Sequence, residues 1–253
     1  MQHILRFMEK ISKAQVKLVR SLQQKKFRDE LGLFVAEGEK CVSELRKAFE
    51  LEMLITEGEN ATRSEIEQMS GLRTPQGVIA VFKKKPIGDL RLKIEDLVLV
   101  LDGIQDPGNL GTIIRTCDWF GVHDIYCSQD TADCFNPKVV QATMGALARV
   151  RIHYVDLPAW LQSQITNRQS QIPIYGTLLD GKNMYEVLQS PITNHQSQII
   201  VMGNEGNGIS QAVRERITHP IRIPSFPANA ETSESLNVAI ATAIVLAEFR
   251  RPR

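Results

Sequence analysis

The chain has few cysteines, and none of them is arranged to bind a metal. Its 253 residues include only Cys41, Cys117, Cys127 and Cys134, with no CxxC pair and no metal-type spacing to a histidine. A zinc site and a disulfide framework are therefore not expected. We expect no metal cofactor, and a reducing cytoplasm is the simpler interpretation.

Long hydrophobic runs are also absent. The longest apolar stretch, residues 236–249, is interrupted by Asn237, Thr242 and Glu248, and it is too short to cross a bilayer. The first residues show no basic-then-apolar signal pattern. The stretch fits a buried helix, so the sequence predicts a soluble, cytoplasmic protein with no membrane partner.

A strong excess of one charge is missing as well. The net charge is +1, whereas domains that bind nucleic acid are usually far more basic. The positive residues gather in three places: residues 1–30, residues 83–85 and the last residues, 250–253. Basic runs are often only solvated helix faces. Contact of the first cluster with phosphate groups is therefore one of two interpretations that stay open.

The N-terminal third has the pattern of a small α/β domain. Apolar runs at 33–36, 51–55 and 77–82 predict strands, a helix is expected at 37–47, and residues 60–70 form a polar stretch. The charged segment around Pro86 and Gly88 has no apolar period. We therefore expect a domain at residues 1–85 and a linker at residues 86–95.

From residue 97 the pattern changes to alternating strands and helices. The run Leu-Val-Leu-Val-Leu at 97–101 is typical of a strand that is covered on both faces. A closing helix is expected from Ser233, as its N-cap, to Arg250. The alternation predicts a mostly parallel sheet, which binds ligands at the carboxyl ends of its strands. Further helices are expected at 109–120 and 136–148, and further strands at 124–127, 150–155, 172–177, 199–202 and 221–223.

Three segments of this second part could carry chemistry. In residues 102–116 a buried strand ends in a Gly/Pro loop and a helix starts near Asn109, with Arg115 further along it. In one interpretation Asn109 is merely an N-cap and Arg115 is a surface charge. In the other, Arg115 uses its planar fork of donors to bind a phosphate or carboxylate. Both interpretations are open at this point.

The second and third segments are ambiguous in the same way. Residues 202–210 contain Gly203, Gly206 and Gly208 directly after an apolar strand. They match neither the dinucleotide fingerprint nor a P-loop, so a plain tight turn is the alternative to a ligand site. Asn237 lies early in an apolar helix, where an unsatisfied amide costs roughly 1–3 kcal/mol. It therefore either caps the helix or meets a ligand.

In this order the three segments resemble the three motifs of the SpoU (TrmH) family of RNA 2′-O-ribose methyltransferases, of the SPOUT superfamily. The motifs are Asn109 with Arg115, the turn at 203–208, and the helix start at 235–237, and the resemblance covers residues 96–253. The segments 34–40 and 74–78 resemble the N-terminal RNA-binding domain of the family. The resemblance to the family then extends over nearly the whole chain.

The resemblance implies an α/β fold with a mostly parallel sheet and a C-terminal trefoil knot, preceded by a small α/β RNA-binding domain. It also implies a homodimer with active sites at the subunit interface. The cofactor would be S-adenosyl-L-methionine. Main-chain groups at four positions would hold it: Thr177, Gly203, Ile223 and Leu236.

The resemblance further implies catalytic roles for Arg115, Asn109, Glu205, Ser235 and Asn237 in methylation of a ribose 2′-hydroxyl. The pKa of a guanidinium is about 12.5 or above, which makes Arg115 a poor base. We expect it to grip a phosphate and to stabilise alkoxide charge, with the proton passing to phosphate or water. Glu205 would orient the 203–208 turn or Arg115, and the other three would supply hydrogen bonds.

The substrate and two rival functions stay open. The extra N-terminal domain favours ribosomal over transfer RNA. A non-catalytic RNA-binding protein on the same scaffold is the main alternative. An ordinary nucleotide-binding α/β enzyme would carry its glycine turn after the first strand. Here the richest glycine turn follows Met202, which disfavours that class.

Overall fold

The chain folds into two compact units, seen in a computed structural model that describes residues 10–85, 96–166, 172–188, 197–227 and 235–251. One unit comprises Met1–Pro86 together with Asp133–Arg149, and the other comprises Ile87–Ala132 and Val150–Arg253. The segment Asp133–Arg149 is thus grouped with the N-terminal residues, which the division expected from the sequence did not include. The expected linker at 86–95 lies outside the described residues.

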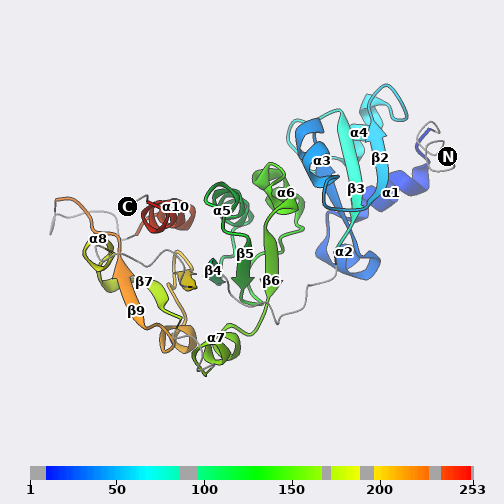
Figure 1. Cartoon of the computed structure of the whole chain (residues 1–253). Coiled ribbons are helices and arrows are strands. Elements are labelled where there is room, and N and C mark those ends of the chain that lie inside the picture. Colours follow the sequence, from blue (N-terminus) through cyan, green and yellow to red (C-terminus); the bar gives the residue numbers. More distant parts are fainter. Residues whose placement is uncertain (1–9, 86–95, 167–171, 189–196, 228–234, 252–253) are drawn as a thin grey trace. The chain divides into compact units, whose positions relative to one another are not determined.

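The first unit is built on a three-stranded antiparallel sheet with strand order β1-β3-β2 (Figure 1). This confirms the small α/β domain expected at the N-terminus. Its strands are β1 (Leu33–Glu37), β2 (Leu51–Thr56) and β3 (Val78–Lys83). Its helices are α1 (Lys13–Ser21), α2 (Lys25–Leu31), α3 (Glu39–Leu45), α4 (Arg63–Met69), α6 (Pro137–Thr143) and the short 3₁₀ helix η2 (Ala146–Ala148).

Alternate residues of this sheet enter two different cores, as the period of a strand requires. Val35 and Val81 pack with Val19 of α1 and Ile66 of α4. On the other face Phe34 stacks on Phe82, with 5.6 Å between ring centroids, and also meets Phe135 at 4.8 Å. Phe135 belongs to the inserted segment, so that segment completes the aromatic core of the first unit.

The inserted segment is also held by a buried ion pair. Arg28 of α2 is 1% exposed, and its Nη2 lies 2.7 Å from Oδ2 of Asp133. The same guanidinium donates through Nη1 to the main-chain oxygens of Leu22 and Gln23, each at 2.9 Å. A buried charge needs such partners, because an unpaired one is costly.

The second unit contains a six-stranded sheet in the order β6-β5-β4-β8-β7-β9, and every pair in it is parallel. This confirms the predicted mostly parallel sheet. The strands are β4 (Leu97–Asp102), β5 (Asp124–Cys127), β6 (Arg151–Tyr154), β7 (Ile174–Asn183), β8 (Gln198–Gly203) and β9 (His219–Arg222). The helices are α5 (Pro107–Trp119), α7 (Leu157–Thr166), α8 (Met184–Val187), α9 (Gln211–Arg214) and α10 (Val238–Phe249).

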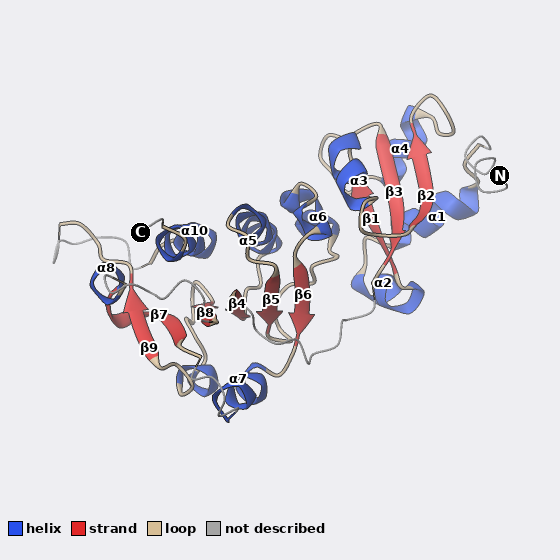
Figure 2. Ribbon diagram, in the orientation of Figure 1, coloured by secondary structure: helices blue, strands red, loops and turns tan. Residues whose placement is uncertain are grey.

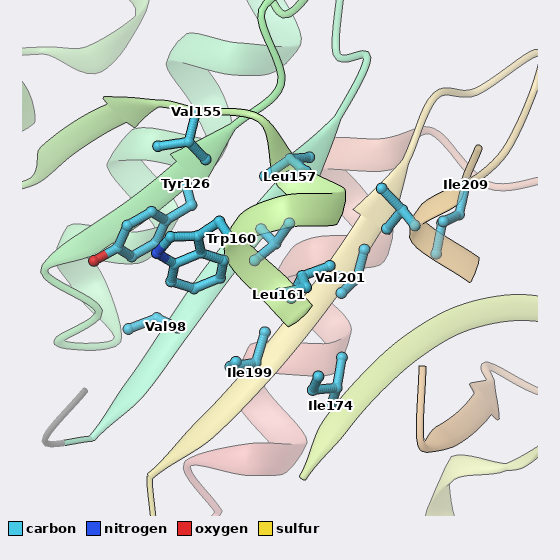
Figure 3. Close-up of a cluster of buried hydrophobic side chains, with 12 residues drawn as sticks. Val98, Tyr126, Val155, Leu157, Trp160, Leu161, Ile174, Ile199, Val201 and Ile209 are labelled. Carbon is cyan, nitrogen blue, oxygen red and sulfur yellow. The ribbon is translucent and has the colours of Figure 1, made fainter. Parts of the chain in front are cut away.

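Helices cover both faces of this sheet: α5 and α10 lie together on one face and α7 on the other (Figure 2). On the α7 face, Tyr126 of β5 stacks on Trp160 with ring centroids 3.9 Å apart. Val98 of β4 and Val201 of β8 belong to the same buried cluster (Figure 3). Coverage on both faces explains the continuous apolar run that begins at Leu97.

Strand order reverses beside β4. This strand pairs with β5, which follows it in the chain, and with β8, which comes much later. Open parallel sheets bind ligands at such a reversal, outside the carboxyl ends of the strands. Asp102 of β4 and Gly203 of β8 are paired at these ends, so the two Gly-containing segments singled out in the sequence emerge side by side.

The helix expected to start near Asn109 begins at Pro107, with Asp106 as its N-cap, so the open interpretation of Asn109 as an N-cap does not hold. The N-cap expected for the closing helix was wrong, because the N-cap of α10 is Asn237 and not Ser233. Ser233 itself lies outside the described residues. Among the residues that the structure describes, no helix is both long enough and apolar enough to span a membrane.

Candidate active site

Three residues from distant parts of the chain meet at one carboxylate. Asn109 and Asn237 donate through Nδ2 to Oε1 of Glu205 at 3.1 and 2.7 Å, and the main-chain N–H of Val238 donates to the same oxygen at 2.9 Å. Asn237 Nδ2 also donates to Oδ1 of Asn109 at 2.9 Å. We call Asn109, Glu205 and Asn237 the Glu205 cluster. It joins all three segments expected to carry chemistry.

The start of α5 fixes one member of the cluster. Asp106 has an extended backbone, its Oδ1 accepts a 2.7 Å hydrogen bond from the N–H of Asn109, and Pro107 occupies the first helical position. Both residues are typical of a helix start. Asn109 is therefore in the first turn, and because Asp106 already serves as the cap, the Asn109 side chain is available to Glu205.

The start of α10 fixes a second member. Oδ1 of Asn237 accepts hydrogen bonds from the N–H groups of Ala239 and Ile240 at 3.0 and 3.2 Å. The amide thus caps the helix with its oxygen and donates to the cluster with its nitrogen. Glu205 lies at the positive end of the α10 dipole, where a carboxylate is stabilised by about 0.3–1 kcal/mol.

Glu205 is presented by a tight turn that Asn204 holds together. Asn204 and Gly208 exchange main-chain hydrogen bonds of 3.0 and 2.9 Å. Oδ1 of Asn204 accepts from the N–H groups of Gly206 and Asn207, while its Nδ2 donates to the oxygen of Gly103 at 2.7 Å. The turn after β8 is thereby fastened to the loop after β4.

Gly203 is required at the end of β8. A Cβ there would lie 2.4 Å from the carbonyl carbon of Gly208 and from the nitrogen of Ile209, both backbone atoms. Gly208 itself has a φ of 67°, a region that glycine adopts without strain. The glycines of this segment therefore allow the end of β8 to approach the backbone of Gly208 and Ile209 closely.

Polar side chains tie the neighbouring strand ends to one another. The buried carboxylate of Asp102 accepts a 2.7 Å hydrogen bond from the N–H of Ser210. The N–H of Gly103 donates to Oγ of Ser128, which follows β5, at 2.8 Å. The carboxyl edge of β4, β5 and β8 is therefore a fixed frame around the Glu205 cluster.

The residues expected to hold the cofactor lie within or after further strands and before the last helix. Thr177 of β7 is paired with Ile221 of β9 and donates through Oγ1 to the oxygen of Val201 at 3.2 Å. Ile223 follows β9 directly and is half-buried. Leu236 precedes the α10 cap and is 45% exposed. Thr177 and Gly203 thus belong to β7 and β8, Ile223 follows β9, and Leu236 precedes α10.

Arg115 and Ser235 form no hydrogen bond with the Glu205 cluster. Arg115 is exposed on α5, and no hydrogen bond or ion pair joins it to any residue that the structure describes. Ser235 is also exposed, and within the described ranges it has no hydrogen-bonding partner. Arg115 is therefore a cation whose donors are available to a ligand, which fits the phosphate role expected for it.

Two residues that hold this site were not singled out in the sequence. The Asp-Pro pair before Asn109 signals an N-cap followed by proline at the first helical position, and it could have identified Asp106. Nothing in the sequence points to Asn204 as the link to Gly103, because the two residues are 101 positions apart.

The chemistry available here is positioning and charge stabilisation. The cluster offers one carboxylate and two amides, and Arg115 offers a guanidinium. Among the described residues, no group of three or more His, Cys, Asp or Glu side chains could hold a metal ion. Such groups can orient a hydroxyl and a phosphate and can stabilise developing negative charge.

Comparison with known proteins decides the family. The model of the SpoU rRNA methylase family matches residues 96–247, the segment that carries the whole site. The chain belongs to the SpoU rRNA methylase family. This confirms the resemblance seen in the sequence. A second model, the MRM3-like substrate binding domain, matches residues 13–80 of this SpoU family chain.

Relatives of this SpoU family chain extend over nearly its full length. The 23S rRNA (guanosine(2553)-2′-O)-methyltransferase RlmP of Bacillus subtilis is 28% identical, with 96% of this chain and 98% of RlmP aligned. A Porphyromonas gingivalis protein assigned to the TrmH family is 38% identical with a TM-score of 0.84, covering 95% of this chain and 98% of its own. An AdoMet-bound rRNA methyltransferase of Sinorhizobium meliloti is 29% identical with a TM-score of 0.79, covering 96% of each.

Proposed function

We propose that this chain is an enzyme that methylates a ribose 2′-hydroxyl in structured RNA, with S-adenosyl-L-methionine as methyl donor. The observation that carries the proposal is the Glu205 cluster, which brings the three family segments together at the strand-order reversal. The name of RlmP, a 23S rRNA 2′-O-methyltransferase, and the match to a substrate binding domain support ribosomal RNA over transfer RNA.

S-adenosyl-L-methionine fits the residues at the carboxyl edge. Thr177, Gly203, Ile223 and Leu236 would hold it through main-chain groups, and the exposed side chain of Leu236 gives an apolar surface suited to an adenine. The S. meliloti relative is described as AdoMet-bound. The bound cofactor would supply a methyl group already activated on sulfur, so that this chain's residues have mainly to position the hydroxyl.

Arg115 would bind the phosphate beside the target ribose and stabilise the negative charge that develops on the 2′-oxygen. Its exposed guanidinium has no partner among the described residues, and a planar fork of donors suits a phosphate. A guanidinium stays protonated at neutral pH. The proton of the hydroxyl would therefore pass to phosphate or to water.

The protein would act as a homodimer, and the surface of α5 and α10 supports this proposal. These helices pack together, yet Trp119 of α5 is 85% exposed and Ile240 of α10 is 55% exposed. An almost wholly apolar helix such as α10 is normally buried, and a second copy of the chain would cover it. The active sites would then lie beside the subunit interface.

Further features of the family belong to the same proposal. The C-terminal part of the sheet would be tied into a trefoil knot, and the functional domains would run from 1–85 and 96–253 with the linker at 86–95. We also propose that no metal is needed and that the protein works in the cytoplasm. The four cysteines, all buried and none in a disulfide, are consistent with a reducing compartment.

Calorimetric titration with S-adenosyl-L-methionine tests the proposal. Wild type should bind the cofactor. Gly203→Val should abolish binding, because any Cβ at this position meets the backbone of Gly208 and Ile209. Gly206→Ala is the matched control, since a Cβ there meets nothing nearer than Oδ1 of Asn204 at 3.5 Å.

Circular dichroism must show that both variants are folded. Absence of binding to wild type would make a non-catalytic RNA-binding protein the preferred function.

A further inference from the structure

The first unit contains a groove that none of the site residues uses. It lies between α1, the turn that joins α1 to α2, the start of α2 and the end of α4, and it has a volume of about 780 Å³. We call it the α1–α4 groove. The residues whose side chains matter for its chemistry are Lys17, Arg20, Gln24, Phe27 and Gln68.

Buried contacts fix the shape of the α1–α4 groove. Val19 and Leu22 enter the core of the unit, which leaves the face of α1 that carries Lys17 and Arg20 toward solvent. Nε2 of Gln23 donates to the main-chain oxygen of Met69 at 3.2 Å and so fastens the α1–α2 turn to the end of α4. The groove is therefore part of the folded unit.

The charge of the groove is unbalanced. Lys17 and Arg20 are exposed and three positions apart, so they are neighbours on one helix face. Neither forms an ion pair with any described residue, and α1 contains no acidic side chain. Glu67, the acidic residue at the edge of the groove, is engaged by Nε of Arg63 at 2.9 Å. Two cations therefore face the groove without a counter-charge.

An aromatic ring and uncommitted amides accompany these cations. Phe27 is half-buried in the groove, and Nζ of Lys26 lies 6.0 Å from its ring centroid. Gln24 is the N-cap residue of α2, but its side chain makes no capping hydrogen bond. The side chain of Gln68 is exposed and likewise has no hydrogen bond within the described residues. Rings stack on bases, and amides can read base edges.

We propose that the α1–α4 groove binds an unpaired segment of the substrate RNA. Lys17 and Arg20 would each neutralise a phosphate, and Phe27 would stack against one base. The inference rests on the proposed function for the nature of the substrate. A single strand fits better than a duplex, because paired bases are not free to stack on a ring in a groove. Cations beside an aromatic ring are the usual combination in proteins that bind single strands.

Fluorescence anisotropy with a labelled, unstructured 12-nucleotide RNA and the full chain tests this inference. Lys17→Gln/Arg20→Gln should reduce the slope of log affinity against log salt by about 1.4, two phosphates at about 0.7 each. Phe27→Leu keeps an apolar side chain but removes the ring, and it should weaken binding about tenfold without changing the salt slope.

Arg46→Gln/Lys138→Gln is the matched control. It also removes one arginine and one lysine that are exposed on the first unit, but neither residue lines the groove. Equal loss of affinity in the control and the groove variant would overturn the inference. So would equal binding of a polyglutamate peptide, which would make the groove a general anion surface, or an unchanged affinity in Phe27→Leu.

Parallel titration with S-adenosyl-L-methionine separates the two proposals. If the chain binds the cofactor normally and the groove substitutions do not change RNA affinity, the groove inference alone is wrong. Loss of RNA binding in the groove variants of a chain that binds no cofactor would support the groove and reject the methyltransferase.

Discussion

Glu205 accepts two amides and one main-chain N–H through a single carboxylate oxygen. The carboxylate therefore sets the separation between the first turn of α5 and the first turn of α10. The two side-chain amides belong to Asn109 and Asn237, which also form a hydrogen bond with each other. Displacement of any one of these residues would shift the other two, which is why we treat them as one positioning group.

Glu205→Ala removes the acceptor of all three donors. We expect kcat for methyl transfer to fall about 100-fold, the size of effect that a misplacement of about 1 Å produces. The free energy of unfolding should fall by only about 1 kcal/mol, because the cluster is exposed. Transfer of labelled methyl groups to ribosomal RNA measures the first quantity and urea unfolding the second.

Glu205→Gln is the control for that experiment, because it keeps one acceptor oxygen and should retain most of the activity. Equal inactivation of both variants would mean that the negative charge matters and that the positioning role is wrong.

Arg115→Lys tests the proposed contact between Arg115 and the phosphate beside the target ribose. Lysine keeps the charge but loses the fork of donors. We expect the KM for RNA to rise and kcat to drop at least tenfold, with the affinity for S-adenosyl-L-methionine unchanged. Steady-state kinetics with both substrates measures this. Full methylation by the lysine variant would refute a bidentate role.

At the residue scale the sequence identifies the members of the site but not their partners. Asn109, Glu205 and Asn237 stand out because polar residues follow buried strands or interrupt an apolar run. Their mutual contacts span 96, 32 and 128 positions, and only strand order brings such distant residues together. No local pattern contains that information. The family resemblance placed the three residues in one active site but did not give their contacts with one another.

The N-terminus of α10 is the element on which the cluster depends. Asn237→Ala removes both the cap and the donors to the cluster, and we expect a loss of about 1 kcal/mol in the free energy of unfolding. Asn237→Ser restores an oxygen that can cap the helix but lacks the amide nitrogen. The serine variant should therefore regain stability without regaining activity, as thermal unfolding and methyl transfer would show. Recovery of both together would reduce Asn237 to a cap.

Acid stability tests a second element, the pairing of β5, which contains Asp124, with the edge strand β6. Burial alone would raise the pKa of the Asp124 carboxyl, but hydrogen bonds with His153 and Arg151 outweigh it and hold that pKa well below its usual value. The stabilisation is therefore complete above the unfolded pKa, about 3.9, and is lost as the pH falls through the lower folded value.

We expect Asp124→Asn to cost about 2 kcal/mol at pH 7. The difference from wild type should shrink below pH 4, as urea unfolding at a series of pH values would show. A difference that does not depend on pH would exclude the ionised carboxylate as the cause.

Strands were easier to predict than helix starts. The apolar run at 97–101 identified β4 because burial on both faces leaves an unmistakable pattern. The start of α10 was misplaced because serine at 233 and asparagine at 237 are both good N-caps, and only the hydrogen bonds distinguish them. Helix α4 lies in the stretch at 60–70, for which the apolar pattern predicts no helix. Its capping box, Thr62 with Glu65, was the available signal.

The proposed active sites depend on the assembly of two chains into a dimer. Trp119→Glu/Ile240→Glu places two charges on the exposed surface of α5 and α10. We expect these substitutions to convert a dimer into a monomer and to abolish methyl transfer, as analytical ultracentrifugation and the activity assay would show. Leu31→Glu, on the 45% exposed side chain at the end of α2, should leave the dimer intact. A wild-type chain that sediments as a monomer at micromolar concentration would reject the proposal.

The grouping of Asp133–Arg149 with the N-terminal residues has a consequence for how this protein can change over generations. The chain passes from one unit to the other at 86–87, 132–133 and 149–150. A recombination event at 86–95 would replace the residues before it but keep Asp133 and Phe135, so Asp133 would lose the buried Arg28 and Phe135 would lose Phe34. Inheritance of the two units is therefore coupled. New substrate preferences in this lineage should arise by point substitution within the existing pair, and not by exchange of one module for another.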